Sequence, residues 1–308
     1  MIPLLLAAAA LPPGPLQFRA EGMRYQPNER RILLDGDVHL DRQDLAVTSD
    51  HAVAETADPA KKAPPPPRGK KKKGNQPAQA TLGGQEVERF TVDGKVHVVR
   101  GQRTADGEHG EMDVPQQTMI LTGTPAQPPV VRDGQETLSG DRILMHLDSE
   151  DIDVTRPHVV LKRSLPVDDN QKQKPASPVR IEAQNLVVHK AARLAKFTDD
   201  VVVRRGDTVV KSPKMDAHYD QDGQLTLLQM RGGVDMRQGD RRAVGQSADY
   251  DAKARTLVLT GDPKVYDRGD VLFGDRIDLY LDSHEVKVDK AKGKLHPEIH
   301  KDEEAKLQ

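Results

Sequence analysis

The chain lacks several residue types that common protein classes need. It has 308 residues with no cysteine and no tryptophan, and aromatic residues make up only 3% of it. Without cysteine, disulfides, thiolate metal sites and thiol nucleophiles are all excluded. Hydrophobic residues reach 36%, which is little for a compact enzyme core but enough for a narrow sandwich of sheets.

An excess of charge of one sign is also missing. Lysine and arginine number 46 against 48 aspartates and glutamates, so the net charge is −2. Such a balance creates no overall field that would attract nucleic acid. We therefore expect no nucleic-acid partner.

Long hydrophobic runs are absent apart from one at the N-terminus. Residues 2–11 are apolar, with alanines at positions 7–10, which resembles the apolar region and cleavage site of a secretory signal, although no basic residues precede it. The run is too short to span a bilayer. We interpret residues 1–17 as a signal segment and expect a periplasmic protein; a buried N-terminal segment is the alternative.

Alternation of apolar and polar residues with period two fills the rest of the chain, and helical periodicity is nearly missing. Val38/Leu40 and Ile277/Leu279 are examples. A short sequence unit recurs about every thirty residues. It consists of an apolar stretch, a Gly-Asp pair and a second apolar stretch. Its Gly-Asp pairs, which we interpret as hairpin turns, are Gly206/Asp207, Gly239/Asp240 and Gly269/Asp270. The pattern predicts an all-β roll, sandwich or barrel.

The chain also contains a second, longer repeat. GDRILMHLDSEDIDV from Gly140 parallels GDRIDLYLDSHEVKV from Gly274, at an offset of 134 residues. The sequence thus predicts an internal duplication. We expect roll 1 at 18–162 with a disordered Lys/Pro insertion at 56–81, a linker at 163–178, roll 2 at 179–290, and a loose charged tail at 291–308.

Candidate catalytic and metal groups are weak. His296 and His300 have helical i, i+4 spacing, but Pro297 argues against a helix. His109 with Glu108 and Glu111 reads as a turn cluster. Paired aspartates, Asp168/Asp169 and Asp199/Asp200, fall at expected turns or linkers. We therefore predict no enzyme, no cofactor and no metal site.

The basic run at residues 70–73, with Arg68, allows two interpretations. It could contact lipid phosphates or an anionic membrane surface. The alternative is a solvated loop, which is the commoner role of such a run.

Three stretches resemble a known family. They are FRAEGMRYQPNERRILLDGDVHLDRQDLAVTSDHAVAE from Phe18, KSPKMDAHYDQDGQLTLLQMRGGVDMRQGD from Lys211 and SADYDAKARTLVLTGDPKVYDRGDVLFGDRIDLYLD from Ser247. Each half of the chain is similar to the OstA-like domain of the lipopolysaccharide transport family, the LptA/LptC group. The series of motifs carries the resemblance, since no single motif is diagnostic.

The resemblance implies an elongated, open-ended antiparallel β-jellyroll, here internally duplicated, with an apolar groove. It implies a periplasmic protein that shields the acyl chains of lipopolysaccharide or a related glycolipid between the inner and outer membranes. Implied partners are other Lpt-type bridge components, bound through edge strands, and further copies joined end to end. We see neither the membrane anchor of an LptC-type protein nor the barrel of an LptD-type protein, so its place in the bridge stays open.

Alternating strands would supply the groove lining, because every second residue points inward. Arg142 and Arg276, at equivalent strand starts, are candidate phosphate contacts at the groove mouth. Two alternatives remain: a scaffold with a closed core that binds envelope proteins through edge strands, and a carbohydrate-active enzyme, which the lack of a carboxylate constellation disfavours. The candidate groove residues are Val38, Leu40, Val47, Val98, Leu121, Ile143, Met145, Val201, Val203, Tyr219, Leu227, Val234, Met236, Leu257, Leu259, Phe273, Ile277 and Leu279.

Overall fold

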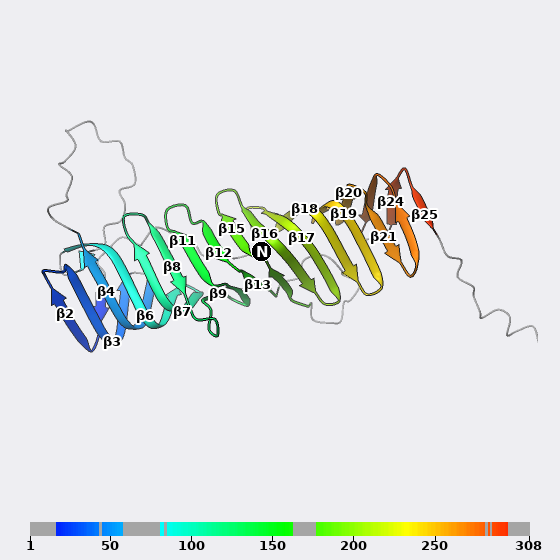
Figure 1. Ribbon diagram of the computed structural model, residues 1–308. Helices are drawn as coiled ribbons and strands as arrows, with labels where there is room; N and C mark the ends of the chain where they lie inside the picture. The colour runs from blue at the N-terminus through cyan, green and yellow to red at the C-terminus, as the bar shows by residue number, and fades with distance from the viewer. Residues whose placement is uncertain are drawn as a thin grey trace, which may run out of the picture.

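The structure, a computed structural model, describes residues 17–42, 45–57, 81–82, 85–162, 177–280, 283 and 285–294. Regular structure in these residues is entirely β-strand, which confirms the all-β prediction. Figure 1 shows an elongated body with β2 near one end and β25 near the other. The signal segment up to residue 16, most of the insertion, residues 163–176 of the linker, and His296 and His300 in the tail lie outside the described residues.

The body consists of two facing layers, A and B, and eight long strands belong to both. Each of these strands pairs with its neighbours first in one layer and then in the other. The long strands are β3 (Arg31–Arg42), β4 (Leu45–Thr56), β6 (Gln85–Arg100), β7 (Arg103–Asp113), β16 (Leu194–Arg205), β17 (Thr208–Tyr219), β18 (Leu225–Gln238) and β19 (Arg241–Asp251).

Most of the long strands cross between layers at a bulge. The register of β16 against β17 shifts between Thr198 and Val201, and the residues between them, Asp199 and Asp200, have φ of 63° and 55°. A bulge adds residues to one strand and bends it. The bends form one closed long side of the body, which we call the crease; hairpin turns form the opposite side, the mouth.

The shorter strands belong to one layer each. Layer A contains β2 (Gly22–Gln26), β8 (Thr118–Thr122), β11 (Arg142–His146), β12 (Ile152–Thr155), β15 (Asn185–His189), β20 (Thr256–Thr260), β23 (Arg276–Tyr280) and β24 (Glu285–Asp289). Layer B contains β1 (Gln17–Arg19), β9 (Val130–Asp133), β10 (Glu136–Ser139), β13 (His158–Leu161), β14 (Val179–Glu182), β21 (Lys264–Asp267), β22 (Asp270–Phe273) and β25 (Lys292–Lys294). The remaining strand, β5 (Thr81–Leu82), pairs with β6.

The middle of the body is built from short strands only. Between β7 and β16, layer A continues through β8, β11, β12 and β15, while layer B continues through β9, β10, β13 and β14. Because β7 and β16 belong to both layers, these pairings close a ring of ten strands.

The pattern of strand pairing occurs twice along the chain. Strand β3 pairs with β1 in layer B and with β2 in layer A, and β16 pairs with β14 and β15 in the same way. At the other end of each set, β11 pairs with β12 as β23 pairs with β24, and β10 pairs with β13 as β22 pairs with β25. These equivalences follow the offsets read from the sequence, while the predicted domain boundaries stay a prediction.

The two sets of strands are joined by backbone pairing in both layers, which we call the junction. In layer A, β12 pairs with β15, with Val154 opposite Leu186. In layer B, β13 pairs with β14, with Val159 opposite Ile181. The two halves therefore form one continuous pair of layers.

The Gly-Asp turns and the C-terminal tail can both be compared with what the sequence predicts for them. The Gly-Asp pairs stand at hairpin turns, and Gly206, Gly239 and Gly269 have φ of 56°, 55° and 98°, values that glycine adopts without steric cost. The tail, however, does not become loose at residue 291. Its residues Lys292–Lys294 form β25 and pair with β22, since the edge of β22 offers unpaired backbone groups.

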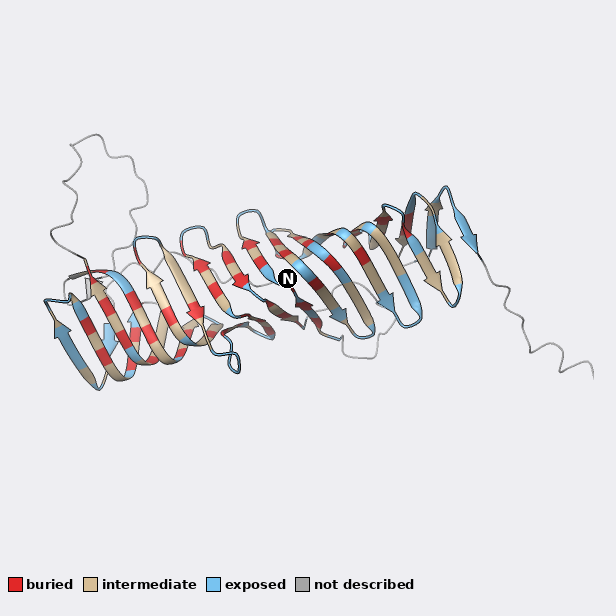
Figure 2. Ribbon diagram, viewed as in Figure 1, coloured by how far each residue is buried: buried red, intermediate tan, exposed pale blue. Residues whose placement is uncertain are grey.

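The core fills the space between the layers. The most buried side chains include Ile143, Phe197 and Ile277. Figure 2 shows buried residues along the strands of the body and exposed residues at its two ends. Large apolar side chains are thus most exposed to solvent at the two ends.

Candidate functional site

An unbroken row of inward-facing apolar residues runs the length of layer A. Each member is directly opposite the next on the neighbouring strand, so the side chains lie about 5 Å apart. Glycine occupies one position of this row, at Gly110. The row consists of Met23, Leu34, Ala52, Val92, Gly110, Leu121, Ile143, Val154, Leu186, Phe197, Met215, Met230, Ala248, Leu259, Ile277 and Val288.

A second row faces it from layer B. It too has one residue on every strand, and it crosses the junction through Val159 and Ile181. The row consists of Phe18, Leu40, Val47, Val98, Ala105, Val131, Leu138, Val159, Ile181, Val203, Val210, Met236, Ala243, Val265, Leu272 and Gly293.

The layer B row is mostly closed in one half of the molecule and half-open in the other. In the first half, Leu40, Val98, Ala105 and Val131 are buried, while Val47 is only partly buried. The equivalent residues in the second half, Val203, Met236, Ala243 and Val265, are only partly buried. The second half therefore presents a continuous apolar surface that is incompletely covered by its own side chains.

Most of the predicted groove residues lie in these rows or next to them on the inward face. Leu40, Val47, Val98, Val203 and Met236 belong to the layer B row. Leu121, Ile143, Leu259 and Ile277 belong to the layer A row. The others that face the core are Val38, Met145, Val201, Tyr219, Val234, Leu257 and Leu279.

Tyr219 is the polar member of the inward set. It packs against the core, and burial raises the pKa of its hydroxyl, with the Glu136 carboxylate adding to the effect. The group therefore stays neutral, as an apolar lining requires.

Two predicted groove residues face outward instead. Leu227 lies opposite His218 and Asp251, while its neighbour Leu228 lies opposite the inward residues Ala217 and Tyr250. A register shift at His218/Tyr219 explains the error, because one extra residue reverses the faces. Phe273 likewise lies opposite the exposed Lys264, and Leu272 takes the inward position.

The two predicted phosphate contacts do begin equivalent strands, β11 and β23, but they are not at the mouth. Both follow connections at the crease, and both alternate with the buried residues Ile143 and Ile277, so they face outward. Arg276 Nε also donates to Asp278 Oδ1 at 2.7 Å. The repeat at an offset of 134 residues made the two arginines equivalent, but it could not say which side of the body they occupy.

A cleft of about 820 Å³ lies along the crease of the second half. It crosses β16 to β19 and includes Val201 and Val234 in its lining, together with Asp199, Asp200 and Asp262. Asp235, which also lines the cleft, accepts a bond from Arg242 at 2.9 Å, and this bond lowers the pKa of the carboxyl. A lining this rich in carboxylates is a poor site for a phosphate group.

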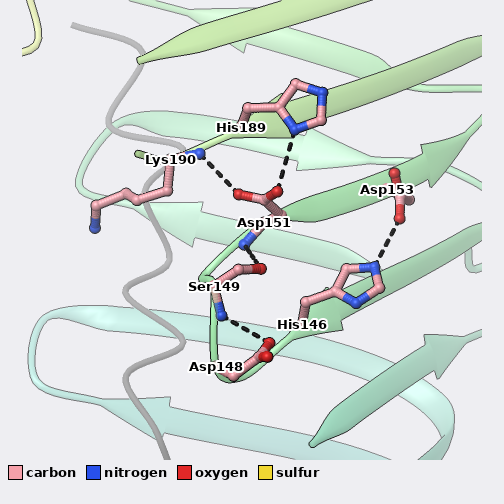
Figure 3. Close-up of polar contacts among 7 residues, drawn as sticks. All are labelled: His146, Asp148, Ser149, Asp151, Asp153, His189 and Lys190. Atoms are coloured by element: carbon pink, nitrogen blue, oxygen red, sulfur yellow. Dashed lines mark hydrogen bonds and ion pairs between the residues drawn. The ribbon is translucent and has the colours of Figure 1, made fainter. Parts of the chain in front are cut away.

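A polar cluster fastens the junction in layer A (Figure 3). Asp151 Oδ1 accepts a bond from the backbone N–H of Lys190 at 3.0 Å, and Asp151 Oδ2 lies 3.1 Å from His189 Nδ1. Beside it, His146 Nε2 lies 2.9 Å from Asp153 Oδ2. In layer B, His158 Nδ1 lies 3.4 Å from Glu182 Oε1 across β13 and β14.

The residues considered for metal binding are not brought together. His109 is on β7 rather than in a turn, with Nδ1 2.5 Å from Asp93 Oδ1, and Glu111 binds Arg89 Nε at 3.1 Å. Within the described ranges, no group of three histidine or carboxylate side chains could hold a metal ion. The described residues also contain no helix that is long and apolar enough to cross a membrane.

Comparison with protein families gives a match over most of the chain. Residues 17–151 and 180–285 match the family described as LptA/(LptD N-terminal domain) LPS transport protein. The first matched range ends just before β12, and the second begins within β14.

Individual relatives match shorter parts of the chain. The LPS-assembly protein LptD of Pseudomonas syringae pv. syringae (strain B728a) is 36% identical over 80 residues, and that of Pseudomonas fluorescens (strain Pf-5) is 40% identical over 81. Each match covers 26% of this chain and 8% of the relative, so the chain spans a small part of these proteins. An uncharacterized protein of Rhizobium meliloti, R00383, is 24% identical over 131 residues, 40% of this chain and 70% of that protein.

Among solved structures, LptH from Pseudomonas aeruginosa, described as the LptA homologous periplasmic component of the lipopolysaccharide transport device, is similar to part of the chain. The identity is 18% and the TM-score is 0.37. The match covers 39% of this chain and 96% of LptH.

Proposed function

The chain belongs to the LptA/LptD N-terminal domain family of LPS transport proteins, and on that premise we propose that it is a periplasmic bridge protein that shields lipopolysaccharide acyl chains. The acyl chains would lie between the two layers, along the half-open part of the layer B row. We also assign the two halves to OstA-like jellyrolls. Members of this family are transport and binding proteins and not enzymes.

The half-open row in the second half is the observation that carries this proposal. Val203, Val210, Met236, Ala243 and Val265 are apolar, inward-facing and only partly buried, and each is directly opposite the next. Burying a methylene group is worth about 0.8 kcal/mol. A continuous row of such residues can therefore offset the free-energy cost of removing an acyl chain from a membrane, whereas separate pockets could not.

The ends of the body support a bridging role. Met23 on β2 is 60% exposed and Phe18 on β1 is 40% exposed, and these two residues are the first members of the two rows. At the other end, Val286 on β24 is 43% exposed. An open edge of a sheet accepts another strand through backbone hydrogen bonds. A neighbouring roll added at either end would cover these side chains and extend both rows.

The alternative function, a scaffold with a closed core, also has an observation in its favour. The layer A row is almost completely buried, including Ile143, Phe197 and Leu259. In a scaffold the interior would only stabilise the fold, and the edges alone would bind envelope proteins.

Site-specific photo-crosslinking to purified lipopolysaccharide separates the two functions. A photoreactive residue placed at Met236 or Leu279 points inward at a partly buried position. The matched controls are Arg237 and Tyr280, which are next in the chain and face outward. We expect labelling of lipopolysaccharide from Met236 and Leu279 at least about tenfold above the controls, because acyl chains that lie between the layers can react only with inward-facing groups.

Equal labelling from both faces would contradict transport through the interior. Folded variants that label envelope proteins at the edges but never label lipopolysaccharide would support the scaffold. Circular dichroism of each variant identifies those that have lost the sheet.

A further inference from the structure

We propose that the two end edges of this chain are built for partners other than a second copy of itself, and that each edge takes a neighbouring strand carrying acidic side chains on its outward face. The proposal rests on the edge pairing proposed above, and it names the chemistry of the strand that pairs. The junction inside the chain supplies the template, because it is a complete end-to-end joint between two rolls.

The repeated pairing pattern identifies which residues would meet if two copies joined end to end. Strands β24 and β25 are equivalent to β12 and β13, and β2 and β1 are equivalent to β15 and β14. A second copy would therefore pair its β2 with β24 and its β1 with β25. On the inward face the match is good, since Val288 would meet Met23 just as Val154 meets Leu186.

The outward face of layer B does not match. At the junction, His158 is opposite Glu182, with the two side chains 3.4 Å apart. The equivalent positions at the ends are Lys292 and Arg19, so two cations would stand directly opposite each other. Like charges in directly opposite positions destabilise strand pairing. The outward face of β25 adds Lys294 and carries no carboxylate.

The outward face of layer A repeats the conflict. Asp153 is opposite Val187 at the junction, and the equivalent end residues are Lys287 and Arg24. Both of these side chains are exposed. Glu285 and Asp289 flank Lys287 but would be diagonal to Arg24, at about 7–8 Å, where the interaction is weaker than between directly opposite residues.

The polar cluster of Figure 3 cannot form between two copies either. Its centre is the bond from the backbone N–H of Lys190 to Asp151. The residue equivalent to Lys190 at the free end is Pro27, which has no backbone N–H to donate. Gln26 replaces His189, and Glu285 replaces Asp151. The junction is thus fastened by groups that the ends lack.

Together these positions define the partner strand. At the N-terminal end it offers acidic side chains opposite Arg19 and Arg24; at the C-terminal end it offers them opposite Lys287 and Lys292. Two copies of this chain would bring cations directly opposite each other in both layers of the joint, so the chain pairs poorly with itself and better with a strand that has opposite charge at those positions. Glu285 and Asp289 also lie on the outward face of β24, and Arg19 lies 3.8 Å from Asp37, so the acidic groups of the partner are expected only at the positions opposite these cations. The protein then enters an assembly as a single link between two different neighbours.

The test uses a full-length fourfold variant, Arg19→Glu/Arg24→Glu/Lys287→Glu/Lys292→Glu, in which both edges are acidic. Sedimentation velocity is measured on the wild type alone, on the variant alone and on an equimolar mixture, at low and at high salt. We expect each protein alone to be monomeric and the mixture to form alternating end-to-end complexes. Association in the mixture should be at least roughly tenfold tighter than self-association of either protein, and high salt should weaken it.

The matched control reverses four exposed lysines that are not at the end edges, Lys211, Lys214, Lys253 and Lys264. It makes the same change in net charge, so complex formation with this control would overturn the assignment to the edges. Wild-type protein that forms end-to-end chains alone would also overturn the proposal, as would a mixture that stays monomeric. None of these results depends on lipopolysaccharide, so failure here is distinct from failure of the crosslinking experiment.

Discussion

The face on which a residue lies decides its role in this molecule more than its type does. Ile143 is fully buried in the layer A row, whereas Leu144, next to it on β11, faces outward and is only partly buried. The same contrast separates Leu228 from Leu227. Aliphatic residues of similar size thus contribute to the core at one position and to the surface at the next.

The pair on β11 allows a direct test. Ile143→Ala removes a fully buried side chain, and surface residues cannot move in to fill the space that it leaves. We therefore expect a loss of about 2–5 kcal/mol in the free energy of unfolding. Leu144→Ala should cost less than about 1.5 kcal/mol, because its side chain is partly solvated. Urea titration followed by circular dichroism measures both. Similar costs for the two variants would show that the inward and outward faces are assigned wrongly.

At the scale of elements, the joint between β12 and β15 is one of the two strand pairings that join the halves into one body. Its backbone pairing is the same as elsewhere in layer A, but the polar cluster around Asp151 is added at the mouth end of the two strands. A carboxylate that accepts two bonds across a joint holds its strands in one register, and register decides which residues face inward.

Replacement of that carboxylate should loosen the joint. We expect Asp151→Ala to lower the free energy of unfolding by about 1–2 kcal/mol, since hydrogen bonds to charged groups are the stronger ones, and to speed amide exchange in β12 and β15. Asp148→Ala is the control, because the bond that Asp148 accepts within the described part of the chain is a local one, from Ser149 N at 2.7 Å. If both variants exchange at the wild-type rate, the cluster does not fasten the joint.

At the scale of the whole molecule, the two apolar rows run through every strand of layers A and B from one end to the other. The strands are most buried near the middle of the body and most exposed at its ends (Figure 2). Met23 and Phe18, the first members of the two rows, are both exposed. Each strand contacts mainly its immediate neighbours, so local stability should follow local burial.

Hydrogen exchange should therefore form a gradient along the body. We expect the slowest exchange in β11, β12, β15 and β16, and the fastest in β1, β2, β24 and β25, because the end strands have one paired edge and little buried surface. Mass spectrometry of peptic peptides measures the gradient. End strands that exchange as slowly as the junction in a monomeric sample would contradict this description of the ends.

The sequence by itself determined the all-β class, the turns and the equivalence of the two halves. Period-two alternation requires strands with two distinct faces, and Gly206 and Gly239 mark turns because glycine accepts positive φ. Alternation also selected most of the inward residues, such as Ile143 and Leu259. These features are local, so a single stretch of chain is enough to specify them.

Only the tertiary structure decided features that depend on contacts between distant strands. The register shift at His218 places Leu228 rather than Leu227 inward, and the crease rather than the mouth holds Arg142. The half-open state of the layer B row depends on how the layers pack. The cations that would meet at a joint between copies, Lys292 and Arg19, are 273 residues apart in the sequence (292 − 19). Strand pairing would place these two residues opposite each other, because it sets which residues meet across a joint.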